Sequence, residues 1–244
     1  MTVILAIGVP RMGKTQALLD YVGAHASTHL FFTTDRSEDW TRDSRDEAGK
    51  ARWRGVRWRD WTAQSARLQA LIGGASMSER PWFCDAPAPD DVREGWLDEL
   101  PPFGVVRFGW PWEGLDVAQA AKDKGNVSLV DDELDFTALM AGWTDNPLRD
   151  FVQRGRHLPN AKGEVGKVHL LGAMRRPQST HIDVTTLADE VFVFRVKGSR
   201  TWKRLVDDRI LEESEVEEVA ELEPYTYKLW RASGDSAWGK LAPL

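Results

Sequence analysis

Gly8-Val9-Pro10-Arg11-Met12-Gly13-Lys14-Thr15 directly follows the apolar run 3–7, VILAI, and leads into a helical pattern that begins at Gln16. It carries two glycines, a lysine and a hydroxyl in the order of a phosphate-binding P-loop, the Walker A motif. Backbone N–H groups must wrap the phosphate chain, and residues without a β-carbon let the backbone come close enough to do so. With a buried strand before it and a helix after it, the stretch predicts an α/β fold with a nucleotide site at the end of its first strand.

Each part of this loop has an expected role. Lys14 would reach the β- and γ-phosphates, Thr15 would place its hydroxyl on Mg²⁺, and the helix that follows would offer its positive N-terminal end. A dinucleotide-binding fingerprint would need glycine where Pro10 stands. The residues expected to bind ATP are Gly8, Val9, Pro10, Arg11, Met12, Gly13, Lys14, Thr15 and Gln16.

Length and composition favour one large domain over residues 1–244. The chain is 42% hydrophobic and 29% charged, which is ordinary for a globular protein with its own core. A single cysteine, Cys84, excludes an internal disulfide and suits a reducing compartment, so we expect a cytoplasmic protein. No apolar stretch approaches the roughly 20 residues of a membrane span, and none is expected.

The charge is unevenly distributed along the chain. The net charge is −6, which argues against a basic coat over the whole protein but leaves room for a local basic patch. Residues 35–60 are rich in arginine and tryptophan and lose the periodicity of the core, so they are expected to form an insertion. Arginine and tryptophan together can bind nucleic acid. The alternative is that the tryptophans pack this insertion onto the sheet.

A second motif candidate lies in the middle of the chain. The strand pattern Val127-Ser128-Leu129-Val130 ends in the three consecutive carboxylates Asp131, Asp132 and Glu133. A Walker B strand delivers one carboxylate to the Mg²⁺ shell and a neighbouring one to the attacking water. Two registers are open: Asp131 at the metal with Asp132 as base, or Asp132 at the metal with Glu133 as base.

The chain after these acids supplies arginines at informative positions. The pattern from Phe136 to Phe151 is helical with a break at Asn146-Pro147, and Arg154 and Arg156 follow at its end. Either could be an arginine finger that reaches the γ-phosphate of a neighbouring subunit. The alternative is that they only compensate the helix dipole.

Two further strand patterns, near 165–173 and 191–196, complete a mostly parallel sheet flanked by helices. Residues 197–244 are expected to form a small C-terminal β-hairpin and a tail, with a hairpin-like alternation from about 201 to 231.

With these motifs in order, the chain resembles the FtsK/HerA superfamily of P-loop ATPases, in particular its viral genome-packaging ATPases and the related Zot-like phage proteins. The resemblance rests on GVPRMGKT, LVDDELDF, RGRH, HLLGAMRRPQSTHIDVTTLADEVFVFRV and SRTWKRLVDD. It covers most of the chain outside residues 35–125.

The resemblance implies a RecA-like core, a ring-shaped homo-oligomer, most simply a hexamer, and double-stranded DNA as the substrate that is moved. It favours the Asp132–Glu133 pair as metal ligand and base. The family strand that ends in Thr-Gln-Arg-Pro corresponds here to Met174-Arg175-Arg176-Pro177, so Arg175 stands where the family has a glutamine that senses the γ-phosphate. Arg175 could take over that contact, or Gln178 could compensate.

The expected function is therefore a Mg²⁺-dependent ATPase that pumps double-stranded DNA into a viral capsid, with a capsid or portal protein as a further partner and a place in the host cytoplasm or the virion. A P-loop kinase for a small molecule shares the loop but needs a lid and an acceptor pocket. A Zot-like assembly protein is the third possibility, although those proteins usually carry a membrane span.

Overall fold

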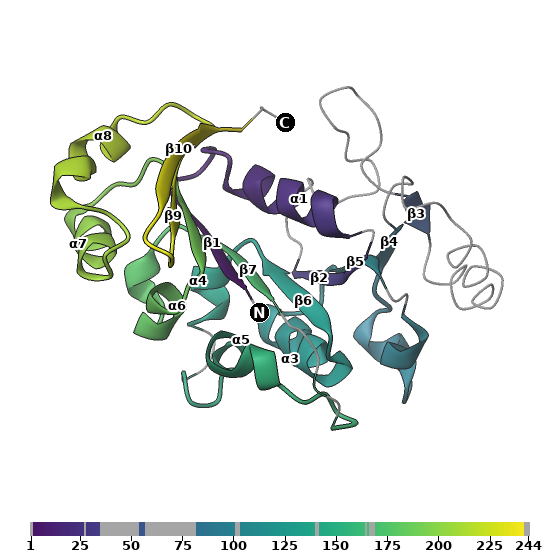
Figure 1. Ribbon diagram of the computed structural model, residues 1–244. Coiled ribbons are helices and arrows are strands. Elements are labelled where there is room, and N and C mark those ends of the chain that lie inside the picture. The colour runs from purple at the N-terminus through teal and green to yellow at the C-terminus, as the bar shows by residue number, and fades with distance from the viewer. Residues whose placement is uncertain are drawn as a thin grey trace.

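The computed structural model describes residues 2–26, 28–34, 54–56, 82–100, 103–139, 142–163, 165 and 169–241. Its strands form one ten-stranded sheet in the order β10-β9-β8-β1-β7-β6-β2-β5-β4-β3 (Figure 1). From β8 to β3 the paired neighbours run parallel, and β9 and β10 join antiparallel at the other edge. The strands are β1 Val3–Ile7, β2 Leu30–Thr34, β3 Arg54–Val56, β4 Trp82–Asp85, β5 Gly104–Phe108, β6 Val127–Asp131, β7 Leu170–Met174, β8 Glu190–Val193, β9 Thr226–Arg231 and β10 Ser236–Lys240.

Helices connect the parallel strands and cover both faces of the sheet (Figure 1). They are α1 Lys14–His25, α3 Gly114–Lys124, α4 Leu134–Thr137, α5 Pro147–Arg154, α6 Ile182–Thr186, α7 Ser199–Asp207 and α8 Val216–Ala220. Short 3₁₀ turns lie at η1 Pro89–Asp91, η2 Trp96–Glu99, η3 Gly155–His157, η4 Pro177–Ser179 and η5 Glu213–Glu215. No helix within the described ranges is long and apolar enough to cross a bilayer.

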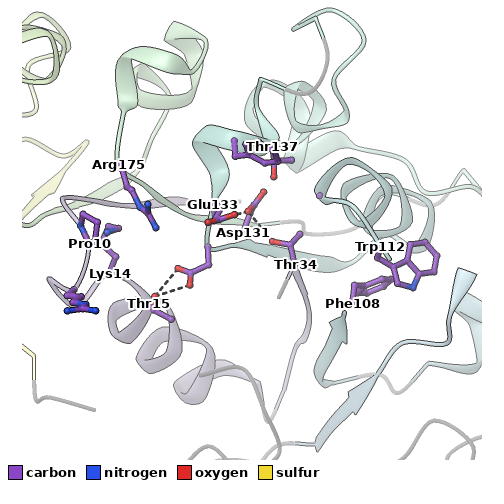
Figure 2. A pocket seen from close by; sticks show the side chains of 14 residues that line it. Pro10, Lys14, Thr15, Thr34, Phe108, Trp112, Asp131, Glu133, Thr137 and Arg175 are labelled. Atoms are coloured by element: carbon purple, nitrogen blue, oxygen red, sulfur yellow. Dashed lines mark hydrogen bonds between the residues drawn. The ribbon is translucent and has the colours of Figure 1, made fainter. Parts of the chain in front are cut away.

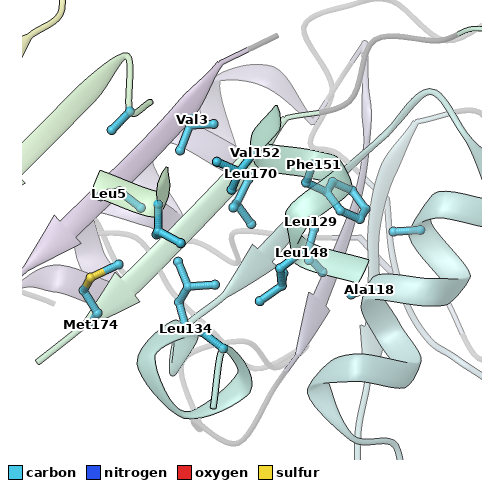
Figure 3. Close-up of a cluster of buried hydrophobic side chains, with 14 of the residues drawn as sticks. Val3, Leu5, Ala118, Leu129, Leu134, Leu148, Phe151, Val152, Leu170 and Met174 are labelled. Carbon is cyan, nitrogen blue, oxygen red and sulfur yellow. The ribbon is translucent and has the colours of Figure 1, made fainter. Parts of the chain in front are cut away.

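The alternation of side chains along β1 divides the core into two layers. Ile4 and Ala6 belong to a cluster on the face that α1 covers. Val3 and Leu5 point to the opposite face, where α3 and α5 add their apolar side chains (Figure 3). Because β1 is fully buried on both faces, its sequence is a continuous apolar run rather than an alternating one.

The strand order brings the sequence motifs to one edge of the sheet. β7 lies between β1 and β6, and all three run parallel. The P-loop follows β1, the three acids close β6, and Arg175 follows β7. The carboxyl ends of neighbouring parallel strands therefore place these groups around one crevice, which is where open α/β sheets bind their ligands.

The helical pattern expected from Phe136 is wrong over most of its first part, because α4 ends at Thr137 and the described residues among 138–146 form turns rather than helix; the start of a helix at Pro147 is confirmed. The side chain of Asn146 caps α5 by accepting a hydrogen bond from the Leu148 N–H at 2.9 Å, and Pro147 occupies the first turn of α5. Proline is favoured there because its missing N–H would have no partner in the helix. The dipeptide that was expected to break a helix thus starts one.

The ends of the sheet show where the sequence patterns were less informative. Of residues 35–60, only β3 lies within the described part, where it pairs with β4 at the sheet edge. The C-terminal hairpin is present as β9 and β10, but the alternation expected from about residue 201 is wrong, because α7 and α8 occupy the preceding segment. Thr201 and Leu205, four residues apart, are the buried positions of α7, which is helical spacing.

Candidate nucleotide-binding site

The P-loop leaves β1 in a conformation that few residues adopt. Arg11 has a φ of 64° and Gly13 a φ of 102°, both in the left-handed region. Gly13 immediately precedes α1, which begins at Lys14. The first turn of an α-helix leaves its N–H groups without partners inside the helix, so this end of α1 is suited to an anion.

One cavity of about 470 Å³ joins the P-loop to the acids at the end of β6 (Figure 2). Lys14 and Thr15 lie on one side of it, Glu133 on another, and Arg175 enters from the end of β7 (Figure 2). Asp132 also lines it. The structure thus brings together residues more than a hundred positions apart in the sequence. The cavity is lined by Pro10, Arg11, Lys14, Thr15, Thr34, Phe108, Trp112, Gly114, Asp131, Asp132, Glu133, Phe136, Thr137 and Arg175.

Lys14 is buried at the floor of this cavity, with 9% of its surface exposed. Its Nζ donates to the carbonyl of Val9 at 2.9 Å. Burial lowers the pKa of Lys14 to about 8, Asp132 opposes the shift, and the positive charge of Arg175 adds to it. A phosphate that arrives beside this lysine would stabilise its charged form, which burial disfavours.

The Thr15 hydroxyl donates to the carboxylate of Asp132, at 3.0 Å from Oδ1 and 2.9 Å from Oδ2 (Figure 2). These are the hard oxygen donors that Mg²⁺ prefers. Among the described residues no three His, Cys, Asp or Glu side chains gather into a ready-made metal cage. Mg²⁺ does not need one, since it commonly combines one or two protein oxygens with phosphate and water. The residues present fit that ion.

Asp131 and Glu133 point in different directions from Asp132. Asp131 is buried, and its Oδ1 accepts hydrogen bonds from the Thr34 hydroxyl and from the Glu133 N–H, both at 3.0 Å. Burial raises the pKa of Asp131, while hydrogen bonds from Thr137, Glu133 and Thr34 counteract the rise. Glu133 is exposed to the cavity. Of the two registers open from the sequence, this geometry favours Asp132 beside the metal and Glu133 beside the water.

Arg175 and Gln178, the two candidates for the sensor role, have different surroundings. The Arg175 side chain reaches into the cavity toward Lys14, and its backbone N–H donates to Asp135 at 3.4 Å (Figure 2). Gln178 instead accepts a hydrogen bond from the Thr201 hydroxyl of α7 at 3.1 Å. Its side-chain oxygen is thus engaged away from the nucleotide cavity, and Arg175 is the better placed of the two.

Arg154, a candidate finger, does not line this cavity. It is the last residue of α5, its side chain is 61% exposed, and it lies 3.8 Å from the Asp150 carboxylate. Its neighbours in a separate hollow include Leu187 and Asp189, which precede β8 and thus lie at the amino edge of the sheet. Arg154 therefore faces away from the nucleotide site of its own chain. The side chain of Arg156 lies outside the described part.

The other residues expected to bind the nucleotide do not line the cavity. Val9 offers its carbonyl to Lys14, and Met12 is packed into the core. The Gln16 side chain donates to Asp20 within α1. Gly8 and Gly13 have no side chains, and both pack closely against other parts of the fold.

The far wall of the cavity was not predicted from the sequence. Thr34 ends β2, and Phe108 ends β5. Trp112 packs edge-on against Phe108 with a centroid distance of 5.3 Å, and its indole N–H donates to the Pro87 carbonyl at 2.8 Å. Phe136 and Thr137 come from α4. These residues belong to no sequence motif. The parallel order β6-β2-β5 places the carboxyl ends of β2 and β5 beside the acids, and that order was the only signal that could have identified Thr34 and Phe108.

Known proteins similar to this chain were found by comparison of structures and not by comparison of sequences. No protein-family model matches it. No curated protein matches its sequence either.

Solved structures match over nearly the full chain. The genome-packaging NTPase B204 of Sulfolobus turreted icosahedral virus 2, solved with sulfate, has a TM-score of 0.60 at 13% identity and covers 99% of this chain and 97% of its own. The same protein with ATP-gammaS has a TM-score of 0.60 at 14% identity, covering 98% and 96%. VirB4 of Thermoanaerobacter pseudethanolicus has a TM-score of 0.54 at 9% identity, covering 99% and 89%.

At these identities the likeness concerns the fold. The expectation of a RecA-like α/β core with a mostly parallel sheet and a C-terminal hairpin is confirmed. The viral packaging proteins named in the sequence resemblance are represented among these structural neighbours by B204. The chain therefore shares its overall fold with the packaging NTPase B204 and with VirB4.

Proposed function

We propose that this protein hydrolyses ATP and uses the energy to move double-stranded DNA, as a packaging motor of a virus does. The observation that carries the proposal is the single cavity in which Lys14 and Thr15 face Asp132 and Glu133. The solved neighbours with this fold include an NTPase bound to ATP-gammaS and one described as a DNA-packaging ATPase.

Within this site the protein residues would position charge around the phosphates. Lys14, once released from the Val9 carbonyl, would bind the β- and γ-phosphate oxygens. Thr15 and Asp132 would hold Mg²⁺, which neutralises charge on those oxygens. Glu133 would accept the proton of the attacking water, and Arg175 would contact the γ-phosphate from the end of β7.

Lys14→Ala and Glu133→Gln test the hydrolytic part of this proposal. Each should lower kcat by about 100-fold or more, since an electrostatic stabiliser or a general base commonly contributes that much. Circular dichroism should remain unchanged. Unaltered turnover in either variant would refute the assignment of the site. ATP consumption that required a small-molecule acceptor would point to a kinase instead.

DNA is supported as the substrate by cations at the same edge of the sheet. Arg176 follows β7, and Lys197 and Arg200 lie beside the start of α7, all exposed. The Thr201–Gln178 hydrogen bond joins α7 to η4, so these cations lie on adjacent segments. Local positive charge on a chain with a net charge of −6 is the kind of patch that contacts a phosphate backbone.

The double variant Lys197→Gln/Arg200→Gln tests this contact. It should retain basal ATPase activity and lose most of the stimulation by double-stranded DNA, with a shallower dependence of DNA affinity on salt. The matched control is Arg93→Gln/Lys162→Gln, which also removes one arginine and one lysine, from side chains 67% and 60% exposed in another hollow. Equal loss of stimulation in both variants would contradict a specific DNA surface.

The motor would be a ring of identical subunits, most simply six, with a capsid or portal protein as its docking partner. In such a ring Arg154 or Arg156 would complete the site of a neighbour. Mixing inactive Arg154→Ala with inactive Lys14→Ala should then restore part of the turnover, because the second variant supplies the missing arginine to the intact P-loop of the first. The same mixture with Arg156→Ala distinguishes the two arginines. Activity of an isolated wild-type monomer would argue against any finger in trans.

A further inference from the structure

The back of the P-loop rests on the C-terminal part of the chain. The N–H of Tyr225, the residue before β9, donates to the carbonyl of Met12 at 2.9 Å. The Tyr225 carbonyl in turn accepts a hydrogen bond from the N–H of Leu241, after β10, at 2.8 Å. Met12 lies two residues before Lys14, so both ends of the hairpin meet at the phosphate-binding loop.

Two aromatic rings fill the space behind the glycines of the loop. A β-carbon at Gly13 would lie 2.9 Å from Cδ1 of Tyr225 and 3.3 Å from Cε1 of Phe194. A β-carbon at Gly8 would lie 2.8 Å from Cβ of Phe194. Phe194 is itself packed against Tyr227 of β9, with ring centroids 5.7 Å apart. Phe194 and Tyr225 thus pack directly against the glycines of the loop.

This packing is important because the backbone conformation of the loop is energetically unfavourable. Arg11 adopts a φ of 64°, which is unfavourable for a residue with a side chain. Tyr225 shows the same unfavourable sign, with a φ of 65°. Such conformations persist where their surroundings over-determine them. The Met12–Tyr225 hydrogen bond joins the two strained segments directly.

We propose that Tyr225 is a positioning residue for the P-loop, one that fixes the loop in its phosphate-binding shape before the nucleotide arrives. The proposal rests on the proposed function, because it assumes that the P-loop binds the phosphates of ATP. Tyr225 does not line the nucleotide cavity, so it acts through Met12 and Gly13 rather than by touching phosphate. A preorganised loop spends less free energy on ordering when ligand binds.

Tripolyphosphate, which has the phosphate chain but no base or sugar, separates this role from stacking on the base. In Tyr225→Ala the affinities for ATP and for tripolyphosphate should both fall about 10-fold, while kcat changes less than about 3-fold, since the loop contacts the phosphates in both ground and transition states. Tyr225→Phe keeps the ring and should bind like the wild type. Loss of ATP affinity alone, or no loss, would overturn the proposal.

Trp230→Ala is the control for general weakening of the hairpin. Trp230 lies on β9 and packs against the main core cluster instead of the P-loop. This variant should lower the Tm without changing tripolyphosphate affinity at temperatures well below the transition. If Trp230→Ala weakened tripolyphosphate binding as much as Tyr225→Ala does, the effect would be one of global stability and the positioning role would be refuted.

Hydrogen exchange in the absence of ligand keeps this question separate from the proposed function. If the wild type bound neither ATP nor tripolyphosphate, the proposed function would be refuted, but the role of Tyr225 could still be tested. The peptide over residues 8–16 should still exchange faster in Tyr225→Ala than in Trp230→Ala if Tyr225 fixes the loop. Equal exchange rates would overturn the role of Tyr225 irrespective of what the loop binds.

Discussion

The Thr15 hydroxyl donates to both carboxylate oxygens of Asp132, at 3.0 Å to Oδ1 and 2.9 Å to Oδ2. This contact crosses from the first turn of α1 to the end of β6, and it joins the two motifs that were recognised separately in the sequence. It also separates Asp132 from Asp131, which is bound to Thr34.

Replacement of Asp132 should affect metal dependence more than folding. In Asp132→Asn the amide keeps a hydrogen-bond acceptor for Thr15 but removes the charge, so the Mg²⁺ concentration for half-maximal ATPase activity should rise about 10-fold or more. Asp131→Asn should instead lower the Tm, because Asp131 is buried, and should leave the Mg²⁺ requirement near that of the wild type. Mg²⁺ titrations and thermal melts of both variants check this. The reverse pattern would assign the metal to Asp131.

Nucleotide affinity should fall as the pH rises above about 8. Burial holds the pKa of Lys14 near 8, and a bound triphosphate stabilises the charged form and raises that pKa. Below pH 8 the lysine is already charged, so affinity is constant. Above it, binding must first take up a proton, and the affinity drops by up to tenfold per pH unit. Calorimetry in buffers of different ionisation enthalpy should detect this proton, and Lys14→Met should abolish its uptake.

Mild acid should destabilise the fold through His29. The His29 ring contacts the Ser128 hydroxyl at 2.8 Å, and burial lowers its pKa to about 4, with a smaller effect of His25. The unfolded chain protonates this ring near pH 6.5. Between pH 6.5 and 4 the unfolded state therefore binds more protons, and the free energy of unfolding falls as the pH falls. Urea titrations of His29→Gln should show a weaker pH dependence over this window, whereas the exposed His157→Gln should match the wild type.

A methyl group at Gly172 should disrupt the middle of the sheet. A β-carbon there would lie 2.2 Å from Cδ2 of Leu134, the first residue after the three acids. Overpacking of this kind costs about 1–3 kcal/mol. Gly172→Ala should therefore unfold at lower urea concentration and lose activity through displaced acids. Gly109→Ala is the matched control, because a β-carbon at Gly109 meets no atom within 4 Å. Equal midpoints for the two variants would contradict this packing.

The sequence was sufficient for the parts of this site that lie next to each other in the chain. The Gly8–Thr15 loop could be recognised because its residues and its flanking strand and helix are contiguous. The choice among Asp131, Asp132 and Glu133 could not be made, because a one-residue shift in a strand turns each side chain to the other face. Only the pairing of β6 with β2 turns Asp131 to Thr34 and leaves Asp132 for Thr15.

Contacts between distant segments were beyond the reach of sequence patterns. Trp112 and Phe136 reach the cavity from elements that carry no motif, and Tyr225 contacts the P-loop from the far end of the chain. The helix α7 was missed because its buried residues are Thr201 and Leu205 alone. Without tertiary contacts, a pattern of two positions cannot be distinguished from strand alternation. Burial against η4 and the core is what decides in favour of the helix.

The insertion of β7 between β1 and β6 has a consequence for how such a fold can diverge. Two steps of the sheet, each about 4.8 Å, separate the strand that bears the loop from the strand that bears the acids. Main-chain hydrogen bonds maintain that separation, and most side-chain substitutions leave these bonds intact. The distance between the P-loop and the three acids is therefore set by the backbone, while most side chains around them can change. This accounts for a shared architecture across nearly whole chains that have only 13% of their residues in common.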